Sequence, residues 1–351
     1  MKFNRKQYDA VFLTNVPAFY KVNLFNEIQK KKNIFVIFVS DESKIRNKDF
    51  YSFNFEFDHY FLNRGSFEDR NKIKTLFNLL KKLSTISYKK IVFSGWEVKE
   101  VTLAALFNKR NKNAIVIESS IIETKKSGLT WFLKKIAVGR MSLAYPSGQL
   151  QKAILEMFSF KGETVITHGV GLSNFKETCL LNKKEYKINR PLRFIYIGRI
   201  SPEKNIDFMV NIFKNLPYEL ILIGDGPLKK QLDNKKYNNI KFLGYIDNKE
   251  LSKEILKSDC FILPSLSEPW GLVVEEALTL GLPVIVSNHV GCHSDLVNER
   301  NGIIFDVNDT QSFIDALMIM ENNYERYLRG ASEFNAIEIA KAQVDAYVGS
   351  I

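Results

Sequence analysis

The stretch SLSEPWGLVVEEALTLG, residues 265–281, decides the interpretation of this chain. It predicts a short loop that enters a helix whose body is almost entirely apolar. Glu276 lies four residues from both Leu272 and Leu280, so it shares a helix face with apolar side chains. A carboxylate on a buried face costs roughly several kcal/mol unless a partner compensates it. The helix therefore needs a partner for this carboxylate.

Composition sets the first limits. A length of 351 residues with 45% apolar residues predicts two globular domains. The three cysteines lie far apart without a C-x-x-C pair, which argues against a disulfide framework and favours a reducing, cytoplasmic compartment. Among the four histidines, only His289 and His293 lie four residues apart. A single pair of this kind belongs more often to a loop than to a metal site, so no metal site is expected. The longest apolar runs are too short to cross a membrane.

The net charge of +11 is unevenly distributed. Residues 1–190 contain 34 Lys and Arg against 17 Asp and Glu, whereas the remainder contains 16 against 22. This asymmetry indicates an anionic partner for the first half: a phosphorylated substrate, an anionic membrane or nucleic acid. Lysine enrichment on a solvated surface explains the excess equally well.

Short apolar runs alternate with longer mixed segments, a pattern typical of parallel α/β units. The expected strands are 9–15, 34–40, 59–63, 90–95, 114–120, 143–148 and 164–169, then 192–198, 218–224, 240–244, 260–265, 283–288 and 302–307. We therefore predict two doubly wound, Rossmann-like α/β domains, whose ligands bind at the carboxyl ends of the strands. The predicted organisation is an N-terminal domain over 1–178, a linker over 179–190, a C-terminal domain over 191–335, and a helix over 336–351 that can cross back to the N-terminal domain.

Distinct strings follow the expected strands of the second half. They are YIGRISPEKN (196–205), LIGDGP (222–227), FLGYIDNKEL (242–251), SLSEPWGLVVEEAL (265–278), SNHVGCHSDLV (287–297) and NGIIF (301–305). In this order they resemble glycosyltransferase family 4, also described as glycosyl transferases group 1, closely over residues 191–310. The resemblance implies the GT-B fold, in which two Rossmann-like domains face each other across a cleft. It also implies a nucleotide-sugar donor bound by the C-terminal domain, an acceptor bound by the N-terminal domain, and transfer with retention at the anomeric carbon.

The resemblance also implies roles for four charged residues. The two glutamates of the family motif fall on Glu268 and Glu276, and Glu276 would bind the ribose hydroxyls of the nucleotide. Glu268 would hold the donor sugar. Arg199 and Lys204 resemble the pair that binds the diphosphate and stabilises the leaving group. The partner that Glu276 requires would then be the nucleotide.

Backbone around these residues completes the predicted donor site. Free N–H groups near Gly271 and Leu272, at the positive end of a helix, form an anion site. The further donor-binding residues implied by the resemblance are Gly198, Gly244, Tyr245, Pro269 and Trp270. No metal and no other cofactor is expected, because two cations and a helix end would balance the diphosphate charge.

The N-terminal half departs from the family pattern. Its first loop, TNVPAFYKVNLF (14–25), contains no glycine, and the resemblance places Tyr20 and Lys21 on the acceptor side. Glu118 stands near the strand end where the family often has a histidine. It is a candidate catalytic group, and a buried or capping carboxylate is the alternative.

The stretch GLTWFLKKIAVGRM, residues 128–141, combines aromatic and basic residues. It predicts either an amphipathic helix on an anionic membrane surface or a helix packed on its own sheet with the lysines reaching outward. Both interpretations remain open at this point.

The predicted function is a hexosyltransferase-type glycosyltransferase that moves a sugar from a nucleotide diphosphate sugar, with a UDP-sugar favoured. The acceptor would be a hydroxyl of a glycan or of a polyprenyl-diphosphate-linked glycan in bacterial surface polysaccharide assembly (O-antigen, capsule or lipopolysaccharide). The enzyme is expected in the cytoplasm, with peripheral contact to the anionic inner face of the membrane left open. Two alternatives are a nucleotide-sugar epimerase of the same fold, against which EPWGLVVEE argues, and a basic nucleic-acid-binding protein, which the acidic second half disfavours.

Overall fold

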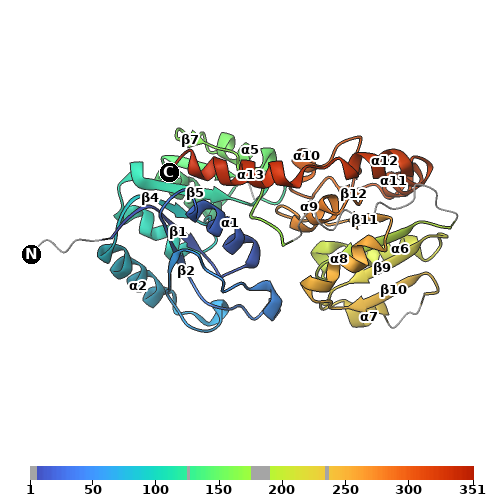
Figure 1. The fold of residues 1–351 in the computed structure, drawn as a ribbon, viewed down its shortest axis with the longest axis horizontal. Coiled ribbons are helices and arrows are strands. Elements are labelled where there is room, and N and C mark those ends of the chain that lie inside the picture. The colour runs from blue at the N-terminus through green and yellow to red at the C-terminus, as the bar shows by residue number, and fades with distance from the viewer. Residues whose placement is uncertain (1–5, 125–126, 175–189, 234–236) are drawn as a thin grey trace, which may run out of the picture. The chain divides into compact units, whose positions relative to one another are not determined.

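The computed structural model of the chain describes residues 6–124, 127–174, 190–233 and 237–351. The chain divides into an N-terminal unit, Met1–Asn174 with Glu338–Ile351, and a C-terminal unit, Phe175–Ile337. Each unit contains one parallel sheet with helices packed on it (Figure 1). The predicted class of two doubly wound, Rossmann-like domains is confirmed.

The sheet of the N-terminal unit has the order β3-β2-β1-β4-β5-β6-β7. Its strands are β1 (Gln7–Thr14), β2 (Ile34–Phe38), β3 (Asp58–Phe61), β4 (Ser87–Phe93), β5 (Asn113–Ile117), β6 (Leu143–Pro146) and β7 (Glu163–Thr164). Every residue of β2 and of β5 is buried, as expected for strands covered on both faces. The strand order reverses between β1 and β4, which pair directly. In such sheets the carboxyl edge at this switch point is where ligands bind.

Helices cover both faces of this sheet. They are α1 (Phe19–Gln29), α2 (Lys72–Thr85), α3 (Lys99–Leu103), α4 (Leu129–Gly139), α5 (Gln149–Met157) and α13 (Ala336–Val348), with short 3-10 helices η1 (Lys48–Phe50), η2 (Phe67–Asp69), η3 (Ala104–Phe107) and η4 (Arg110–Lys112). Buried side chains of α1 and α13 share one apolar cluster, and those of α2 to α5 share the other. The helix at the end of the chain therefore completes the N-terminal unit (Figure 1).

The sheet of the C-terminal unit has the order β10-β9-β8-β11-β12-β13. Its strands are β8 (Arg193–Ile197), β9 (Glu219–Ile223), β10 (Ile240–Gly244), β11 (Cys260–Leu263), β12 (Val284–Ser287) and β13 (Gly302–Phe305). Its helices are η6 (Pro202–Lys204), α6 (Ile206–Phe213), α7 (Lys229–Asp233), α8 (Asn248–Leu256), α9 (Leu272–Thr279), α10 (His293–Leu296), α11 (Thr310–Asn322) and α12 (Tyr324–Ser332). Here the order reverses between β8 and β11, so the loops after these two strands flank the switch point.

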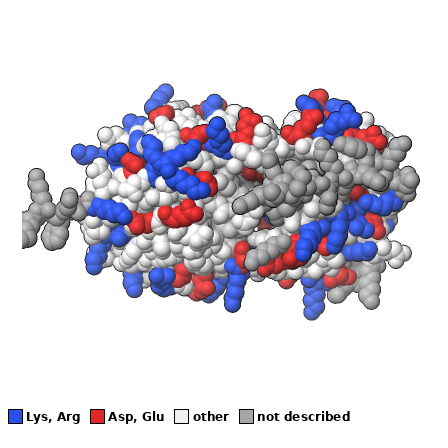
Figure 2. Space-filling model, viewed as in Figure 1, with Lys and Arg blue, Asp and Glu red and all other residues white. Residues whose placement is uncertain are grey.

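The structure gives boundaries for the two predicted domains. The N-terminal unit ends its first segment at Asn174, and α13 begins at Ala336. The predicted linker, 179–190, lies outside the described residues up to residue 189. Within the described parts of the chain, no helix has the length and apolarity needed to cross a bilayer. On the face shown in Figure 2, acidic and basic side chains intermingle.

Candidate active site

Two loops meet at the switch point of the C-terminal unit. The loop after β8 ends in η6 with Lys204, and the loop after β11 carries Glu268. The backbone N–H of Leu266 donates to the carbonyl of Glu203 at 2.8 Å, which fixes the loops to each other. Lys204 Nζ forms an ion pair with the Glu268 carboxylate, and both side chains are largely buried. The structure thus brings together the residues predicted to hold the diphosphate and the sugar.

Arg199 stands at the start of the β8 loop, directly after Gly198. Its carbonyl accepts a hydrogen bond of 2.8 Å from the buried Tyr196 hydroxyl, whereas its side chain is exposed. Among the described residues the guanidinium forms no ion pair, although it lies close enough to act on Glu203. The pKa of Glu203 is lowered mainly by the Ser201 hydroxyl, with Lys204 and Arg199 adding to the effect. This strand end therefore presents two cations.

Glycines allow the neighbouring strand-end turns to pack backbone to backbone. A Cβ on Gly224 would lie 1.9 Å from the carbonyl oxygen of Gly198, and one on Gly226 would lie 2.4 Å from that of Ile200. The N–H of Gly224 donates to the carbonyl of Gly244 at 2.8 Å, so the ends of β8, β9 and β10 form one surface. Tyr245, which follows Gly244, is exposed on it.

The first turn of α9 lies against the turn after β12. Gly271 caps the helix in a left-handed conformation (φ +100°), and a Cβ there would come within 3.0 Å of Val290 Cγ1. Pro269 is exposed and Leu272 is partly exposed at this end. Trp270 is buried, so any contact it makes with a donor would come from its backbone. The predicted anion site thus consists of backbone at the start of an eight-residue helix.

The structure corrects the burial expected for the α9 carboxylates. Glu275 is the buried one, at 4% exposure, and its Oε2 has no hydrogen-bond partner among the described residues. Burial and the neighbouring Glu276 raise the pKa of Glu275 to about 8; the Trp270 indole lies near enough to oppose this rise but outside hydrogen-bonding geometry. An eight-residue helix that is apolar on most sides offers no clear periodicity, which is why the sequence pattern missed the burial of Glu275.

Glu276 is only partly exposed, yet its carboxyl is strongly desolvated, which raises its pKa to about 8. Across the described residues it has neither a hydrogen-bond nor an ion-pair partner. A desolvated carboxyl of this kind is stabilised by any hydroxyl that donates to it.

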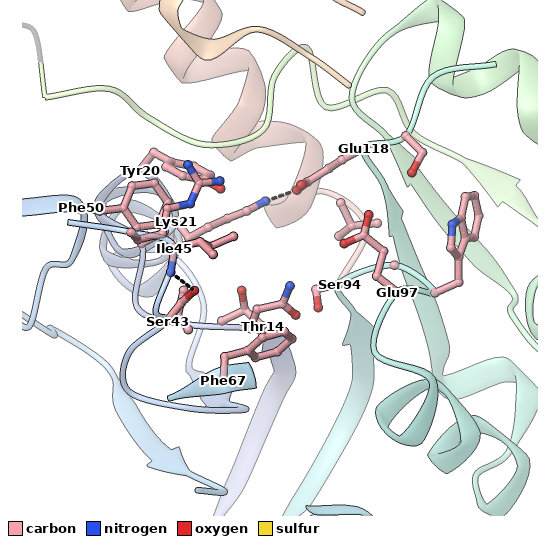
Figure 3. A pocket seen from close by; sticks show the side chains of 18 of the residues that line it. Thr14, Tyr20, Lys21, Ser43, Ile45, Phe50, Phe67, Ser94, Glu97 and Glu118 are labelled. Atoms are coloured by element: carbon pink, nitrogen blue, oxygen red, sulfur yellow. Dashed lines mark hydrogen bonds and ion pairs between the residues drawn. The ribbon is translucent and has the colours of Figure 1, made fainter. Parts of the chain in front are cut away.

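A pocket of about 290 Å³ opens in the N-terminal unit (Figure 3). It lies at the switch point of the first sheet, since Thr14, Ser94 and Glu118 follow or end β1, β4 and β5 and all line it. Aromatic side chains, including Tyr20 and Phe50, cover part of its wall. The pocket therefore combines apolar surface with polar strand-end groups, as small-molecule sites do.

The three residues predicted in this half all line the pocket. Lys21 reaches from α1 and forms an ion pair with Glu118, with side-chain exposures of 10% and 35% (Figure 3). The Tyr20 ring lies beside them, 5.7 Å from Lys21 Nζ, and burial raises the pKa of its hydroxyl. Glu118 is thus a paired carboxylate that remains open to the pocket.

Three further charged residues of the pocket, Arg46, Glu68 and Glu97, were missed by sequence reasoning. Glu97 follows β4 much as Glu118 follows β5, so the strand-end rule could have found it. Desolvation and the nearby Glu118 raise the pKa of Glu97. Arg46 lies over the Phe50 ring at 4.5 Å, in a loop without a recognisable pattern. No group of three potential metal ligands occurs in the described segments.

Comparison with known proteins identifies the C-terminal half. Residues 181–333 match the model of the family "Glycosyl transferases group 1". This region is similar to the group 1 glycosyltransferases. The resemblance drawn from the strand-end strings is confirmed.

Similar curated proteins include two bacterial ones. The Escherichia coli UDP-Gal:alpha-D-GlcNAc-diphosphoundecaprenol alpha-1,3-galactosyltransferase is 33% identical over 44% of this chain and 44% of its own length. The putative teichuronic acid biosynthesis glycosyltransferase TuaC of Bacillus subtilis (strain 168) is 29% identical over 60% of this chain and 54% of its own. The chain thus spans about half the length of these relatives.

Among solved structures, the lipopolysaccharide outer core galactosyltransferase WaaB is similar over 98% of this chain and all of its own, with a TM-score of 0.71 and 13% identity. This similarity covers both units and shows the GT-B fold for the group 1 domain and its N-terminal partner.

Proposed function

We propose that the chain is a retaining glycosyltransferase that transfers a hexose-type sugar from a nucleotide diphosphate sugar, with a UDP-sugar favoured. The observation that carries this proposal is the pairing of Lys204 with Glu268 at the switch point, beside Arg199 and the desolvated, partnerless Glu276. One site would then offer cations for a diphosphate and carboxylates for sugar hydroxyls. Relatives named galactosyltransferase and teichuronic acid glycosyltransferase support the same class.

Each residue of the proposed donor site would have a defined role in the transfer. Arg199 and Lys204 bind the diphosphate oxygens and stabilise the charge that develops as the bond from the anomeric carbon to the diphosphate breaks. The new bond forms from the acceptor oxygen on the same face of the sugar, and the acceptor proton passes to the departing diphosphate. Glu268 holds the sugar hydroxyls and Glu276 the ribose hydroxyls. The reaction would need no metal, since the protein cations and the α9 terminus balance the leaving group.

The acceptor would bind in the N-terminal unit. Its pocket offers the aromatic wall of Tyr20 and Phe50 and the carboxylate of Glu118, which Lys21 keeps in place. Glu118 would accept a hydrogen bond from the acceptor hydroxyl and orient it. A glycan or a polyprenyl-diphosphate-linked glycan of a bacterial surface polysaccharide fits this proposal, because one relative is named for such an acceptor. The enzyme would then work in the cytoplasm at the inner face of the membrane.

Donor binding is tested first by thermal unfolding with UDP, GDP, dTDP, ADP and CMP, each in EDTA. A ligand at about one hundred times its dissociation constant adds about 2.7 kcal/mol to the free energy of unfolding, so one nucleoside diphosphate should raise the melting temperature clearly. NMR of the product should then show the anomeric configuration of the donor. A folded sample that responds to no nucleotide, or an inverted product, contradicts the proposal.

A further inference from the structure

The helix α4 presents an apolar stripe outward. Its inner side packs normally, with Val138 buried and the Trp131 ring 4.1 Å from that of Phe158. The outward residues are Leu129, Phe132, Leu133 and Ile136, which are 73%, 58%, 48% and 44% exposed. Their spacing of three, four and seven residues is that of a helix face that normally packs on a core. This helix therefore has two apolar faces, and only one is covered.

A second exposed apolar group lies beside it. At the end of α3 and in η3, Leu103, Leu106 and Phe107 are 47%, 50% and 71% exposed. The segment from α3 to η4 connects β4 to β5, and α4 lies between β5 and β6, so both pack on the same face of the sheet. Hydrogen bonds join them: Arg140 Nη2 donates to the Asn108 carbonyl and Arg110 Nε to that of Gly139, both at 3.1 Å.

We call these seven side chains the apolar patch: Leu103, Leu106, Phe107, Leu129, Phe132, Leu133 and Ile136. Large exposed patches of this kind on soluble proteins mark interaction sites, whereas single exposed apolar residues are ordinary.

The surroundings of the apolar patch are cationic. Residues 101–155 contain only two acidic residues, Glu118 and Glu123, and both are partly buried, whereas Lys109, Arg110 and Lys135 are exposed. The nearby Glu100 does not offset these charges at the surface, because it is buried and paired with Arg70 at 2.6 Å. Lys134 instead turns inward, with Nζ 4.8 Å from the Trp96 ring. Apolar side chains ringed by Lys and Arg match the chemistry of an anionic lipid surface.

We propose that the apolar patch docks the chain on an anionic membrane. Leu129, Phe132 and Leu133 would enter the boundary between headgroups and acyl chains, and the cations around them would contact lipid phosphates. A second copy of the chain is a poorer occupant, because a two-fold contact through this patch would bring like charges together. Nucleic acid would match the cations but gains little from exposed aliphatic side chains. The inference deepens the proposed function, since docking would bring the protein to a lipid-linked acceptor.

Flotation of the full-length protein with vesicles tests the docking directly. Wild type should bind phosphatidylcholine vesicles that contain phosphatidylglycerol and bind pure phosphatidylcholine much more weakly. The double variant Phe132→Ser/Leu133→Ser should lose about ten-fold or more in partition to the anionic vesicles, since two large apolar side chains no longer enter the bilayer. The variant Lys109→Glu/Lys135→Glu should lose binding to anionic vesicles and respond little to salt.

The matched control is Met318→Ser/Ile319→Ser on α11, where both side chains are similarly exposed, at 51% and 44%. It should bind vesicles like wild type, and thermal unfolding should confirm that all variants are folded. Absence of wild-type binding, equal binding to both vesicles, or unchanged binding by the Phe132/Leu133 variant overturns the proposal. So does sedimentation showing that this variant abolishes a dimer. Nucleotide-induced thermal shifts measure the donor site separately, so failure of docking and failure of the transferase proposal are distinguishable.

Discussion

Glu275 and Glu276 are adjacent on α9, but their side chains lie in different surroundings. The Glu275 side chain lies on the buried side of α9 near Trp270, where no described group donates to its Oε2. Glu276 lies partly exposed beside the strand-end surface. Both have a pKa of about 8, but only Glu276 is placed to receive a ligand hydroxyl.

Replacing Glu276 with alanine should weaken nucleoside diphosphate binding by about ten-fold or more. The ribose hydroxyls would make two hydrogen bonds to this carboxyl, each contributing about 0.5–1.5 kcal/mol, and both would be lost without removing the diphosphate contacts. Titration calorimetry with the nucleotide chosen by thermal shift provides the measurement. Glu163→Ala on β7 is a control with an exposed carboxylate in the other unit. Equal affinity of Glu276→Ala and wild type would remove the ribose role.

Glu275 predicts a pH dependence of stability. Its pKa is raised from an ordinary 4.5 to about 8, so the folded state binds this proton more tightly than the unfolded state. Its contribution to the free energy of unfolding is therefore present at low pH and is lost as pH rises from about 4.5 to about 8, at up to about 1.4 kcal/mol per pH unit. Glu275→Gln cannot ionise and should melt at a higher temperature than wild type near pH 8, with the difference vanishing toward pH 5.

Melting curves of Glu275→Gln, Glu276→Gln and wild type across that pH range separate the two carboxyls. If the wild-type melting temperature instead rises from about pH 5 to about pH 8, and Glu275→Gln does not show this rise, then folding lowers the pKa of Glu275. That result would refute this account.

Arg199 should matter for turnover far more than other exposed arginines of the same unit. Its guanidinium is exposed, is free of ion pairs within the described residues and acts, like Lys204, on the nearby Glu203, so it can bind a diphosphate in both its ground and transition states. Arg199→Ala should lower kcat/KM about a hundred-fold or more, the range for removing one transition-state donor. Arg329→Ala, exposed on α12, should leave kcat/KM nearly unchanged. Similar losses in both variants would undo the diphosphate assignment.

At the scale of elements, the two sheets present their chemistry at corresponding places. In each unit the strand order reverses beside the first strand, and segments that follow the strands there form a Lys–Glu ion pair: Lys21 on α1 with Glu118, and Lys204 in η6 with Glu268. The carboxyl ends of parallel strands project loops to one edge, so residues far apart in sequence meet there. This geometry explains why strand-end residues dominate both sites.

The glycine at the end of β9 maintains the shape of the donor loop. Gly224→Ala would put a Cβ 1.9 Å from the Gly198 carbonyl oxygen, at a φ of +135° that alanine rarely adopts. We expect the β8 loop to shift, the affinity for nucleotide to fall at least ten-fold, and the melting temperature to drop. Gly139→Ala, where a Cβ would meet open space, should be tolerated. Crystal soaks or calorimetry that find normal nucleotide binding in Gly224→Ala would contradict this role.

Apolar runs and strand-end strings were sufficient to predict the parallel sheets, the helix α4 within a residue or two, and several of the residues that lie at the two strand-end sites. Continuous apolar runs such as β2, which is buried at all five positions, are typical of parallel strands that are covered on both faces. The exposed stripe of α4 could not be predicted, because its outer and inner faces are both apolar and periodicity alone cannot say which is covered. The same ambiguity hid the burial of Glu275. The pocket residue Arg46 depends on a loop position that tertiary packing determines, whereas Glu97 follows β4 and could have been found from its place after a strand.

At the scale of the whole molecule, the end of the chain is part of the N-terminal unit. Tyr347 on α13 is buried against the rings of Phe12 and Tyr145, at 5.6 and 4.6 Å. Gln343 Oε1 accepts a hydrogen bond of 3.0 Å from the Gly171 N–H. The N-terminal fold is therefore complete only when the last helix is in place, after the C-terminal unit has been synthesised.

Tyr347→Ala should consequently destabilise the N-terminal unit although it lies near the end of the chain. Removing a large buried aromatic side chain costs about 3–5 kcal/mol, which lowers the melting temperature of a unit of this size by on the order of 10 °C. Calorimetry should show the loss in a transition that nucleotide does not protect, because the predicted donor site belongs to the other unit. Ile337→Ala, at the start of α13 and 61% exposed, should change the melting temperature little. If Tyr347→Ala melts like Ile337→Ala, the helix is not required by the N-terminal fold; if both transitions fall together, the two units unfold as one cooperative structure.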